Sequence, residues 1–334
     1  MVTDREDGEG LTYAESGVDI AASESATGAL LSAIDADSVG DYAGILDIGD
    51  RLLGITTDGV GTKSLVAEAV GDFSTIGIDC IAMNVNDLVA SGIEPIAFVD
   101  YLAVEEPDDA IAEAIGQGLD TGATTAGIHL AGGETAVMPE VISGLDLAGA
   151  AIGVAGHDTV LPGEATPGDR LVGFPSSGIH SNGLTLARAA VTREHSYSDP
   201  FPGDRTKSIG AELLEPTAIY THLLEPMRAA NAHAAAHITG GGWTNLDRLG
   251  RHRYEITDPF EPQSIFSFVQ DAGGISDREM YRTFNMGTGF VVALPDDRAE
   301  ILLAETDGRI IGTVSSGTGI SVDGLDLEPA DSAG

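Results

Sequence analysis

Apolar and polar positions follow two different periods along the first half of the chain. Short runs rich in β-branched residues have the pattern of strands. Longer runs repeat their apolar residues at helical spacing, and one of them has Ser74 as a candidate N-cap and Gly92 as a stop. Strands are predicted over 51–56, 94–105, 127–133 and 146–156, with helices over 74–92 and 107–127 between them.

A segment without periodicity divides the chain. Residues 161–170, LPGEATPGDR, are rich in proline and glycine, and the alternation of elements restarts after them. The sequence therefore predicts two domains, over 1–160 and 168–334, of α/β or α+β type. In the second, strands are predicted over 170–178 and 289–295, helices over 182–194 and 210–230, and a final hairpin over 309–324.

The charge balance narrows the possible functions. Acidic residues outnumber basic ones 53 to 16, which gives a formal net charge of −37. No cluster of Lys and Arg is visible, and this argues against a nucleic-acid partner. Molar salt shortens the Debye length to about 3 Å. A surface this acidic therefore suggests adaptation to a salt-rich cytosol.

The expected compartment is the cytoplasm. No apolar run approaches the roughly 20 residues that a bilayer span needs, so no membrane partner is predicted. The first ten residues are acidic and polar, unlike a secretory signal. Cys80 is the only cysteine, so no intrachain disulfide can form. Its apolar neighbours indicate a packed side chain and not a nucleophile.

Lys63 is one of only two lysines in the chain, the other being Lys207. It ends the stretch TDGVGTK, in which Asp58 follows a predicted strand and Gly59 and Gly61 permit a tight turn close to a ligand. An ammonium group here suits phosphate oxygens, although the stretch is neither a P-loop nor a dinucleotide fingerprint. The alternative is a plain turn with a solvated lysine, but the scarcity of lysine favours a function.

Polar residues interrupt the predicted helix 74–92. Asp79 and Asn86 are seven residues apart and share a face, and Asp87 lies about 100° further round. Such residues are poor helix formers, so among apolar neighbours they need partners. Their oxygens suit Mg²⁺, which takes one or two carboxylates together with substrate phosphates. The alternative is a hydrogen-bonded structural pair.

Glu134 is a third candidate metal ligand. It lies in GGETAVMP, residues 132–139, which follows a predicted strand. Glycines and an acid at the carboxyl end of a strand occupy the usual ligand position of an α/β sheet. If the fold brings Asp58, Asp87 and Glu134 together, they form a plausible site for Mg²⁺ and a nucleotide.

Two glycine- or serine-rich stretches in the second half could bind anions. SSGIHSNG, residues 176–183, precedes a predicted helix and contains His180. HITGGGWTN, residues 237–245, has three successive glycines. The alternatives are a helix cap by Ser181 or Asn182 in the first stretch and a flexible turn in the second.

The ordered series of motifs resembles the phosphoribosylformylglycinamidine cyclo-ligase family, also called aminoimidazole ribonucleotide synthetase. The resemblance runs from about Tyr13 to Pro295. The motifs that carry it are YAESGVDI, TTDGVGTK, TIGIDCIAMNVNDLVASGIEPIAFVDY, GGETAVMP, SSGIHSNG, LLEPTAIY, HITGGGW and YRTFNMGTG. Two departures stand out. Ala14 replaces a basic residue common in the family, and the acidic stretch 41–50 replaces a glycine-rich loop.

The resemblance implies an ATP-dependent ring closure in purine synthesis. The formyl oxygen of formylglycinamidine ribonucleotide would be phosphorylated, an amidine nitrogen would attack, and phosphate would leave. The implied fold is an α/β domain followed by an α+β domain, in a homodimer whose N-terminal sheets pair. The implied cofactors are ATP and Mg²⁺.

The resemblance also implies roles for individual residues. His180, Lys63 and Asp87 would be catalytic, with His180 serving as general acid–base or as oxyanion support. Asp58, Asp87 and Glu134 would bind the metal. ATP would contact Asp58, Gly59, Gly61, Thr62, Lys63, Asn86, Asp87, Glu134 and Thr135, and the substrate would contact Ser177, His180, Ser181, Asn182, Thr239, Gly240, Gly241 and Gly242.

Other readings come from the same superfamily. A selenophosphate synthetase would need a reactive cysteine near the N-terminus, and none precedes Cys80. A thiamine-monophosphate kinase would lack the pairing of HSNG with LLEPT, and a hydrogenase-maturation relative would typically end in cysteine. A catalytically inactive nucleotide-binding scaffold is the remaining alternative, favoured only by the altered stretch 41–50.

Overall fold

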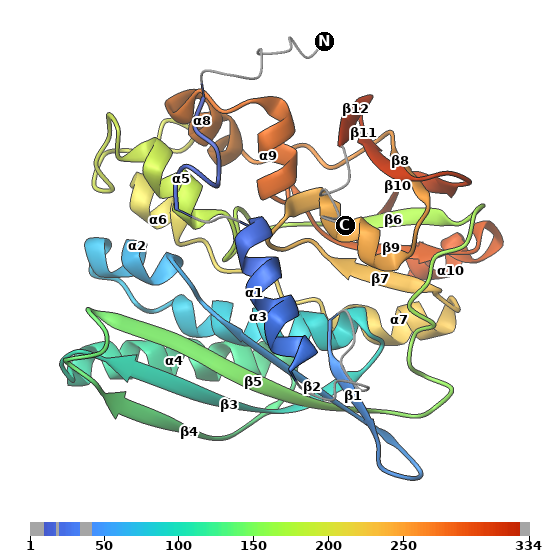
Figure 1. Ribbon diagram of the computed structural model, residues 1–334, viewed down its shortest axis with the longest axis horizontal. Coiled ribbons are helices and arrows are strands. Elements are labelled where there is room, and N and C mark those ends of the chain that lie inside the picture. The colour runs from blue at the N-terminus through green and yellow to red at the C-terminus, as the bar shows by residue number, and fades with distance from the viewer. Residues whose placement is uncertain (1–9, 18–19, 34–41, 328–334) are drawn as a thin grey trace.

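The computed structural model describes residues 10–17, 20–33 and 42–327, which form two lobes, each built on a mixed sheet (Figure 1). The N-terminal lobe contains the first sheet, in the order β1-β2-β5-β3-β4. Its strands are β1 (Gly44–Asp47), β2 (Leu52–Gly59), β3 (Glu94–Val104), β4 (His129–Val137) and β5 (Leu145–Ala155). The predicted strands and the mixed α/β character are confirmed.

Helices cover one face of this sheet. They are α2 (Lys63–Val70), α3 (Ile76–Ala90) and α4 (Asp109–Ala126), and α1 (Ile20–Ser32) precedes the sheet. The predicted cap at Ser74 is wrong, because α3 begins after Thr75 and Ser74 instead donates to the carboxylate of Asp72. Asp108 caps α4 by accepting from the N–H groups of Ala110 and Ile111.

Helices α3 and α4 cross at glycines. A Cβ on Gly77 would lie 2.4 Å from the backbone nitrogen of Leu119, and one on Gly118 would lie 2.6 Å from the carbonyl oxygen of Ser74. The two backbones therefore approach more closely than any side chain permits. This crossing fixes α3, which carries Asp79, Asn86 and Asp87, against the rest of the lobe.

The C-terminal lobe contains the second sheet, in the order β12-β11-β8-β10-β6-β9-β7. The predicted hairpin over 309–324 is wrong, because β10 pairs with β6 on one side and β8 on the other and has no free edge. Instead, β11 runs parallel to β8 and makes its hairpin with β12. The strands are β6 (Arg170–Pro175), β7 (Ala234–His237), β8 (Arg253–Ile256), β9 (Thr288–Leu294), β10 (Arg309–Ser315), β11 (Gly319–Val322) and β12 (Leu325–Leu327).

The helices of this lobe are short. They are α5 (Leu184–Val191), α6 (Ile209–Leu213), α7 (Leu224–Ala229), α8 (Ser264–Gly273), α9 (Asp277–Thr283), α10 (Ala299–Ala304) and the 3₁₀ helices η1 (Thr221–Leu223), η2 (Gly242–Leu249) and η3 (Asp296–Arg298). Cys80 is fully buried in the core, as predicted for a packed thiol. Among the described residues, no helix has both the length and the apolar character of a membrane span.

Candidate active site at the junction of the lobes

Two carboxylates lie close together where β2 ends beside α3. The Asp58 carboxylate accepts the N–H of Gly59 at 2.7 Å, and that of Asp87 lies 2.9 Å from Nδ1 of His237. Both contacts use Oδ1, and neither Oδ2 makes a hydrogen bond to another described residue. Each carboxylate is therefore oriented by one donor and keeps one oxygen for a ligand.

The electrostatic environment of Asp58 favours the binding of a cation. Burial raises the pKa of Asp58 to about 6, the Gly59 N–H opposes this, and the charge of Asp87 raises the pKa further. His237 and Arg248 lower it by smaller amounts. A Mg²⁺ ion would remove the repulsion between the two carboxylates, and two carboxylates plus phosphate oxygens are its usual ligands. The residues present therefore fit the ion.

His237 is a site residue that the sequence did not single out. It is the last residue of β7 and fully buried, and it connects the C-terminal lobe to Asp87 in α3. Its Nε2 lies 3.3 Å from the Asn86 side-chain nitrogen, which can only donate. The proton of a neutral ring must then lie on Nδ1, facing Asp87. Its place three residues before the glycine run, in HITGGGW, was the available signal.

Asn86 joins the lobes through its whole side chain. Its Nδ2 donates to the carbonyl of Ala218 at 2.9 Å, and its Oδ1 accepts from the N–H of Tyr220, also at 2.9 Å. Asn86 is fully buried. Its contacts hold the segment after α6 against α3, and Asn86 thereby supports the site by joining the two lobes.

Glu134 does not join Asp58 and Asp87 within one chain. The stretch 132–139, expected to be a turn after a strand, instead continues β4 as far as Val137. Across the sheet, Glu134 pairs with Tyr101, three strand steps and about 14 Å from Gly59. Neighbouring pairs share a face, so Glu134 points to the face opposite Asp58. In the described part of the chain, no three His, Cys, Asp or Glu side chains form a metal site.

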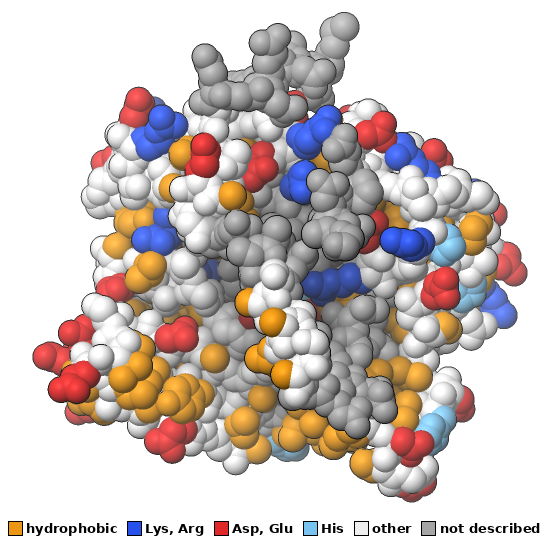
Figure 2. All heavy atoms as spheres, in the orientation of Figure 1, with side chains coloured by type: hydrophobic (Ala, Val, Ile, Leu, Met, Phe, Trp, Pro, Cys, Tyr) orange, Lys and Arg blue, Asp and Glu red, His pale blue; other side chains and the backbone are white. Residues whose placement is uncertain are grey.

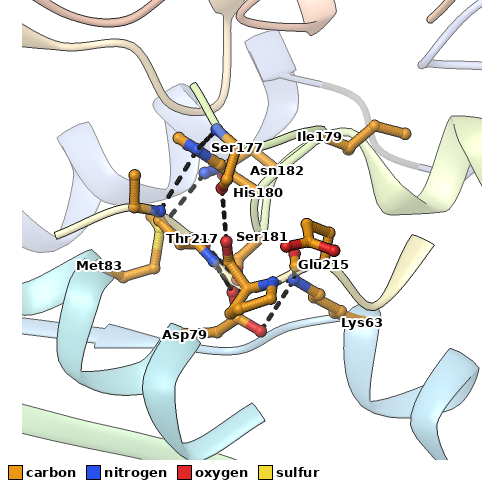
Figure 3. A network of polar contacts seen from close by, with 12 residues as sticks. Lys63, Asp79, Met83, Ser177, Ile179, His180, Ser181, Asn182, Glu215 and Thr217 are labelled. Atoms are coloured by element: carbon orange, nitrogen blue, oxygen red, sulfur yellow. Dashed lines mark hydrogen bonds and ion pairs between the residues drawn. The ribbon is translucent and has the colours of Figure 1, made fainter. Parts of the chain in front are cut away.

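Lys63 is placed differently from the expected phosphate-binding lysine. Its side chain is fully buried, and its Nζ lies 2.9 Å from both carboxylate oxygens of Asp79 (Figure 3). It also donates to the carbonyl oxygen of Glu215 at 2.6 Å. Burial lowers the pKa of Lys63, and the charge of Asp79 opposes this. The ammonium group thus belongs to an internal ion pair, not to the solvent-facing turn that the sequence suggested.

His180 is the buried centre of the loop 176–183. It has a positive φ of 66°, a conformation uncommon for residues other than glycine. Its Nε2 accepts the N–H of Ser177 at 3.2 Å and that of Ala218 at 3.4 Å. Its Nδ1 must then carry the proton, and this atom is buried without a hydrogen-bond partner among the described residues. Burial lowers the pKa of His180 well below its usual value, and His237 and Lys63 add to the effect.

The neighbours of His180 are tied to the segment 215–218. Ser177 Oγ donates to the carbonyl of Pro216 at 2.5 Å, and Ser181 Oγ lies 3.5 Å from the hydroxyl of Thr217. Asn182 is only half buried and donates to the sulfur of Met83 in α3 at 3.6 Å. The predicted substrate residues therefore lie together at the junction of the lobes.

The glycine turn before η2 faces Asn182. Gly241 and Gly242 have positive φ values of 90° and 53°, which only glycine adopts readily. A Cβ on Gly240 would lie 3.2 Å from the side-chain oxygen of Asn182. Gly240 is exposed and Thr239 half buried, so the turn presents backbone and hydroxyl groups beside the loop 176–183.

Comparison with known proteins decides the family. The model of the AIR synthase related protein N-terminal domain matches residues 40–155, and that of the C-terminal domain matches residues 166–324. The phosphoribosylformylglycinamidine cyclo-ligase of Methanosarcina barkeri is 47% identical over 329 residues, which is 95% of this chain and 98% of that protein. The chain belongs to the phosphoribosylformylglycinamidine cyclo-ligase family. Its relative in Pyrococcus furiosus is 44% identical, covering 94% of this chain and 98% of that protein.

Solved structures show the fold that the cyclo-ligase shares with more distant proteins. Thiamine monophosphate kinase from Aquifex aeolicus superposes with a TM-score of 0.62 at 20% identity, over 93% of this chain and 98% of that one. The hydrogenase maturation protein HypE, in a complex with ATP, gives 0.59 at 19% identity over 87% of each chain. These sequence identities are far below those of the cyclo-ligases. The comparisons therefore favour the cyclo-ligase family over the kinase and the hydrogenase-maturation protein.

The remaining predicted nucleotide residues of the cyclo-ligase lie apart. Gly61 is exposed, and Thr62 Oγ1 lies 2.9 Å from the hydroxyl of Thr185 in α5. Thr135 is exposed on β4, at the edge of a cavity of about 550 Å³ that Phe73 and Leu102 also line. Only Thr62 among these three contacts the other lobe.

The two departures of the cyclo-ligase from its family pattern lie in a segment bound to the C-terminal lobe and at a sheet edge. Ala14 is exposed, in a segment that Tyr13 fixes to the C-terminal lobe through its N–H and the carboxylate of Glu279, 2.7 Å apart. Residues 44–47 form β1, the edge strand beside β2. Asp41 and residues 18–19 lie outside the described residues.

Proposed function

We propose that Asp58, Asp87 and the loop 176–183 form the active site of this cyclo-ligase, where ATP drives the closure of formylglycinamidine ribonucleotide to aminoimidazole ribonucleotide. The observation that carries the proposal is the pair of carboxylates at the lobe junction. Each has one oxygen fixed by a donor and one that makes no hydrogen bond to the residues that the structure describes. Such a pair suits the cation that accompanies a triphosphate.

Asp58 and Asp87 would hold Mg²⁺, which would neutralise charge on the transferred phosphoryl group. The formyl oxygen of the substrate accepts the γ-phosphoryl group of ATP, and ADP is released. An amidine nitrogen then attacks the activated carbon and loses a proton, while the carbon–oxygen bond breaks and phosphate leaves. The residues of the protein position these groups and balance their charge, and no covalent protein nucleophile is needed.

We assign His180 the role of a neutral hydrogen-bond donor. Its Nε2 is occupied by two backbone N–H groups, so this atom cannot take a proton from the substrate. Its Nδ1–H is buried and has no hydrogen-bond partner in the described part of the chain, which is a costly state that a substrate oxygen would relieve. Of the two roles implied by the resemblance, oxyanion support therefore fits better than general acid–base chemistry.

The glycine turn and Asn182 would bind the phosphate of the ribonucleotide. Backbone N–H groups at Gly240 and Gly241 suit an anion without requiring a lysine, which this chain almost lacks. The half-buried amide of Asn182 lies beside the turn. This arrangement places the substrate phosphate on the C-terminal lobe and the ATP phosphates on the N-terminal lobe.

A homodimer would cover the open face of the first sheet. Helices α3 and α4 lie on the inner face, and Figure 2 shows apolar side chains gathered over the lower part of the molecule, where this sheet lies. Exposed apolar residues on the outer face include Ile55, Val99, Tyr101 and Ile152. A patch of this kind on a sheet is a typical protein interface. Glu134 lies on the same face and would be at that interface.

The acidic surface would adapt the cyclo-ligase to high salt, in the cytoplasm of a halophilic organism. A net charge of −37 repels itself across the surface at low ionic strength. The melting temperature should fall markedly on dialysis from molar to millimolar salt. An unchanged melting temperature would contradict this adaptation.

A comparison of substrates tests the proposed reaction. The purified protein, in molar salt with ATP and Mg²⁺, should release ADP with formylglycinamidine ribonucleotide and not with thiamine monophosphate. ADP release with thiamine monophosphate alone would replace the proposal by a kinase. ATP binding without turnover of either compound would favour a nucleotide-binding scaffold.

A further inference from the structure

We infer that the buried pair Lys63–Asp79 is a positioning device that sets the place of His180 through the segment 215–218. The inference rests on the proposed function, because it concerns the geometry of that site. It replaces the phosphate-binding role expected of Lys63 by a role inside the protein. Three of the contacts that carry it, from Lys63 to Glu215 and from Thr217 to Asp79, cross from one lobe to the other.

The N-terminal lobe holds the segment through two residues. Glu215 is bound by its carbonyl oxygen to Lys63 Nζ at 2.6 Å. Thr217 donates twice to Asp79 Oδ1, from its N–H at 2.8 Å and from its hydroxyl at 2.6 Å. Figure 3 shows Lys63, Asp79 and Thr217 converging beneath the loop of His180.

The loop of His180 is bound by the other two residues of the segment, Pro216 and Ala218. Pro216 accepts from the hydroxyl of Ser177 at 2.5 Å, and Ala218 donates its N–H to His180 Nε2 at 3.4 Å. Successive residues of an irregular segment thus bond alternately to the ion pair and to the loop, and the Thr217 hydroxyl also lies 3.5 Å from that of Ser181 in the loop. A shift of the segment on one side must therefore move the loop on the other.

The chemistry of the pair supports positioning more than stability. Both side chains are fully buried, and burying two charges costs most of what their attraction returns. A well-packed apolar pair is often as stable. An ion pair with four directed bonds nevertheless specifies a geometry that an apolar pair cannot. The chain contains only two lysines, and one of them is used here.

The orientation of the His180 ring depends on few hydrogen bonds. Among the described residues, the ring makes hydrogen bonds only at Nε2, with the N–H groups of Ser177 and Ala218. Asn285 supports the preceding turn by donating to the carbonyl of Gly178 at 2.8 Å, but it does not touch the ring. The direction of Nδ1–H therefore depends on both N–H groups, and that of Ala218 connects it to the anchor at Thr217.

Thr217→Val is the sharpest variant, because it removes one hydroxyl, keeps the side-chain shape and leaves both charges in place. We expect kcat to fall about tenfold or more, since small displacements near reacting groups are costly. KM for ATP should change little. Amide exchange in the peptide containing 215–218 should become faster.

The double variant Lys63→Met/Asp79→Asn separates stability from positioning. Either single change leaves a buried charge unpaired and should lower the melting temperature, whereas the double change removes both charges. We expect the double variant to recover much of the melting temperature while kcat stays low. Lys207→Met is the matched control, because Lys207 contacts the carboxylate of Glu215 on the exposed side and should be dispensable.

The outcomes distinguish this inference from the proposed function. A wild-type protein that does not turn over formylglycinamidine ribonucleotide contradicts the function, and unchanged amide exchange in Thr217→Val would then contradict the anchor as well. With an active wild type, full kcat in Thr217→Val, or recovery of both kcat and melting temperature in the double variant, overturns the inference.

Discussion

Nδ1 of His237, at the end of β7, lies 2.9 Å from Oδ1 of Asp87 in α3. This contact joins the two lobes through residues that are 150 positions apart in the sequence. The contact orients a carboxylate proposed to bind Mg²⁺. Partners behind a metal ligand fix its direction and raise its basicity. If Asp87 binds Mg²⁺ as proposed, the C-terminal lobe would take part in metal binding without supplying a ligand.

Replacing His237 should weaken metal-dependent nucleotide binding. His237→Gln is expected to raise the Mg²⁺ concentration needed for half-maximal ATP binding by about 10–100-fold. Isothermal titration of ATP at several Mg²⁺ concentrations measures this. His233→Gln is the control, because His233 makes a similar contact of 2.9 Å with Asp169 away from the proposed ligands. Equal Mg²⁺ dependence in the two variants would contradict the role of His237.

Asp58 should cost the ligand-free protein stability at neutral pH. The pKa of Asp58 is about 6 in the folded state, above the ordinary value of 3.8, so its contribution to stability is lost as pH rises from 4 through 6. At pH 7.5, Asp58→Asn should increase the free energy of unfolding by on the order of 2–3 kcal/mol. Denaturant titrations without Mg²⁺ at both pH values measure the difference. A gain that persists at pH 4 would point to another cause.

Some of this site was predictable, because it follows from residue type and position. Asp58 and Asp87 were candidate ligands whose convergence the sequence left open, and the structure places Asp87 close enough for its charge to raise the pKa of Asp58. Asp79 and Asn86 were expected to need buried partners, and both have them. The partners of Asn86 come from the other lobe, 130 residues or more away, and so does Thr217, the partner of Asp79 that lies 138 residues away. No local pattern identifies them.

The crossing of α3 and α4 should not tolerate a methyl group. Gly77→Ala is expected to reduce the free energy of unfolding by about 1–3 kcal/mol, because the new Cβ would meet backbone atoms that cannot move aside. Gly116→Ala on α4 is the matched control, since a Cβ there meets open space. It should instead stabilise by about 0.5–1 kcal/mol through helix propensity. Similar losses in both variants would show that the crossing is not the cause.

The outer face of the first sheet should hold the dimer together. Ile152→Glu places a charge in the middle of that face and should convert a dimer to a monomer, as light scattering in molar salt would show. Val141→Glu is the control, because Val141 is 74% exposed in the loop between β4 and β5 and not on the sheet face. A dimer that survives Ile152→Glu would place the interface elsewhere.

Lys63 and Glu134 show where the sequence misled, for different reasons. The rarity of lysine drew attention to Lys63, but a charged residue in a glycine-bearing turn gives no sign of burial. Its partner Asp79 was considered only as a polar residue of the predicted helix 74–92. The glycines before Glu134 resemble a turn, yet they continue β4 because pairing with β3 extends past them. Tertiary pairing decided both cases.

The most direct test of the proposed site is the turnover of Asp87→Asn beside the wild type, in molar salt with ATP, Mg²⁺ and formylglycinamidine ribonucleotide. The wild type should form ADP, phosphate and a diazo-reactive aminoimidazole in equal amounts. Asp87→Asn should keep the wild-type melting temperature within a few degrees and lose about 100-fold or more in kcat. A folded Asp87→Asn variant with the wild-type rate would contradict the proposed metal site.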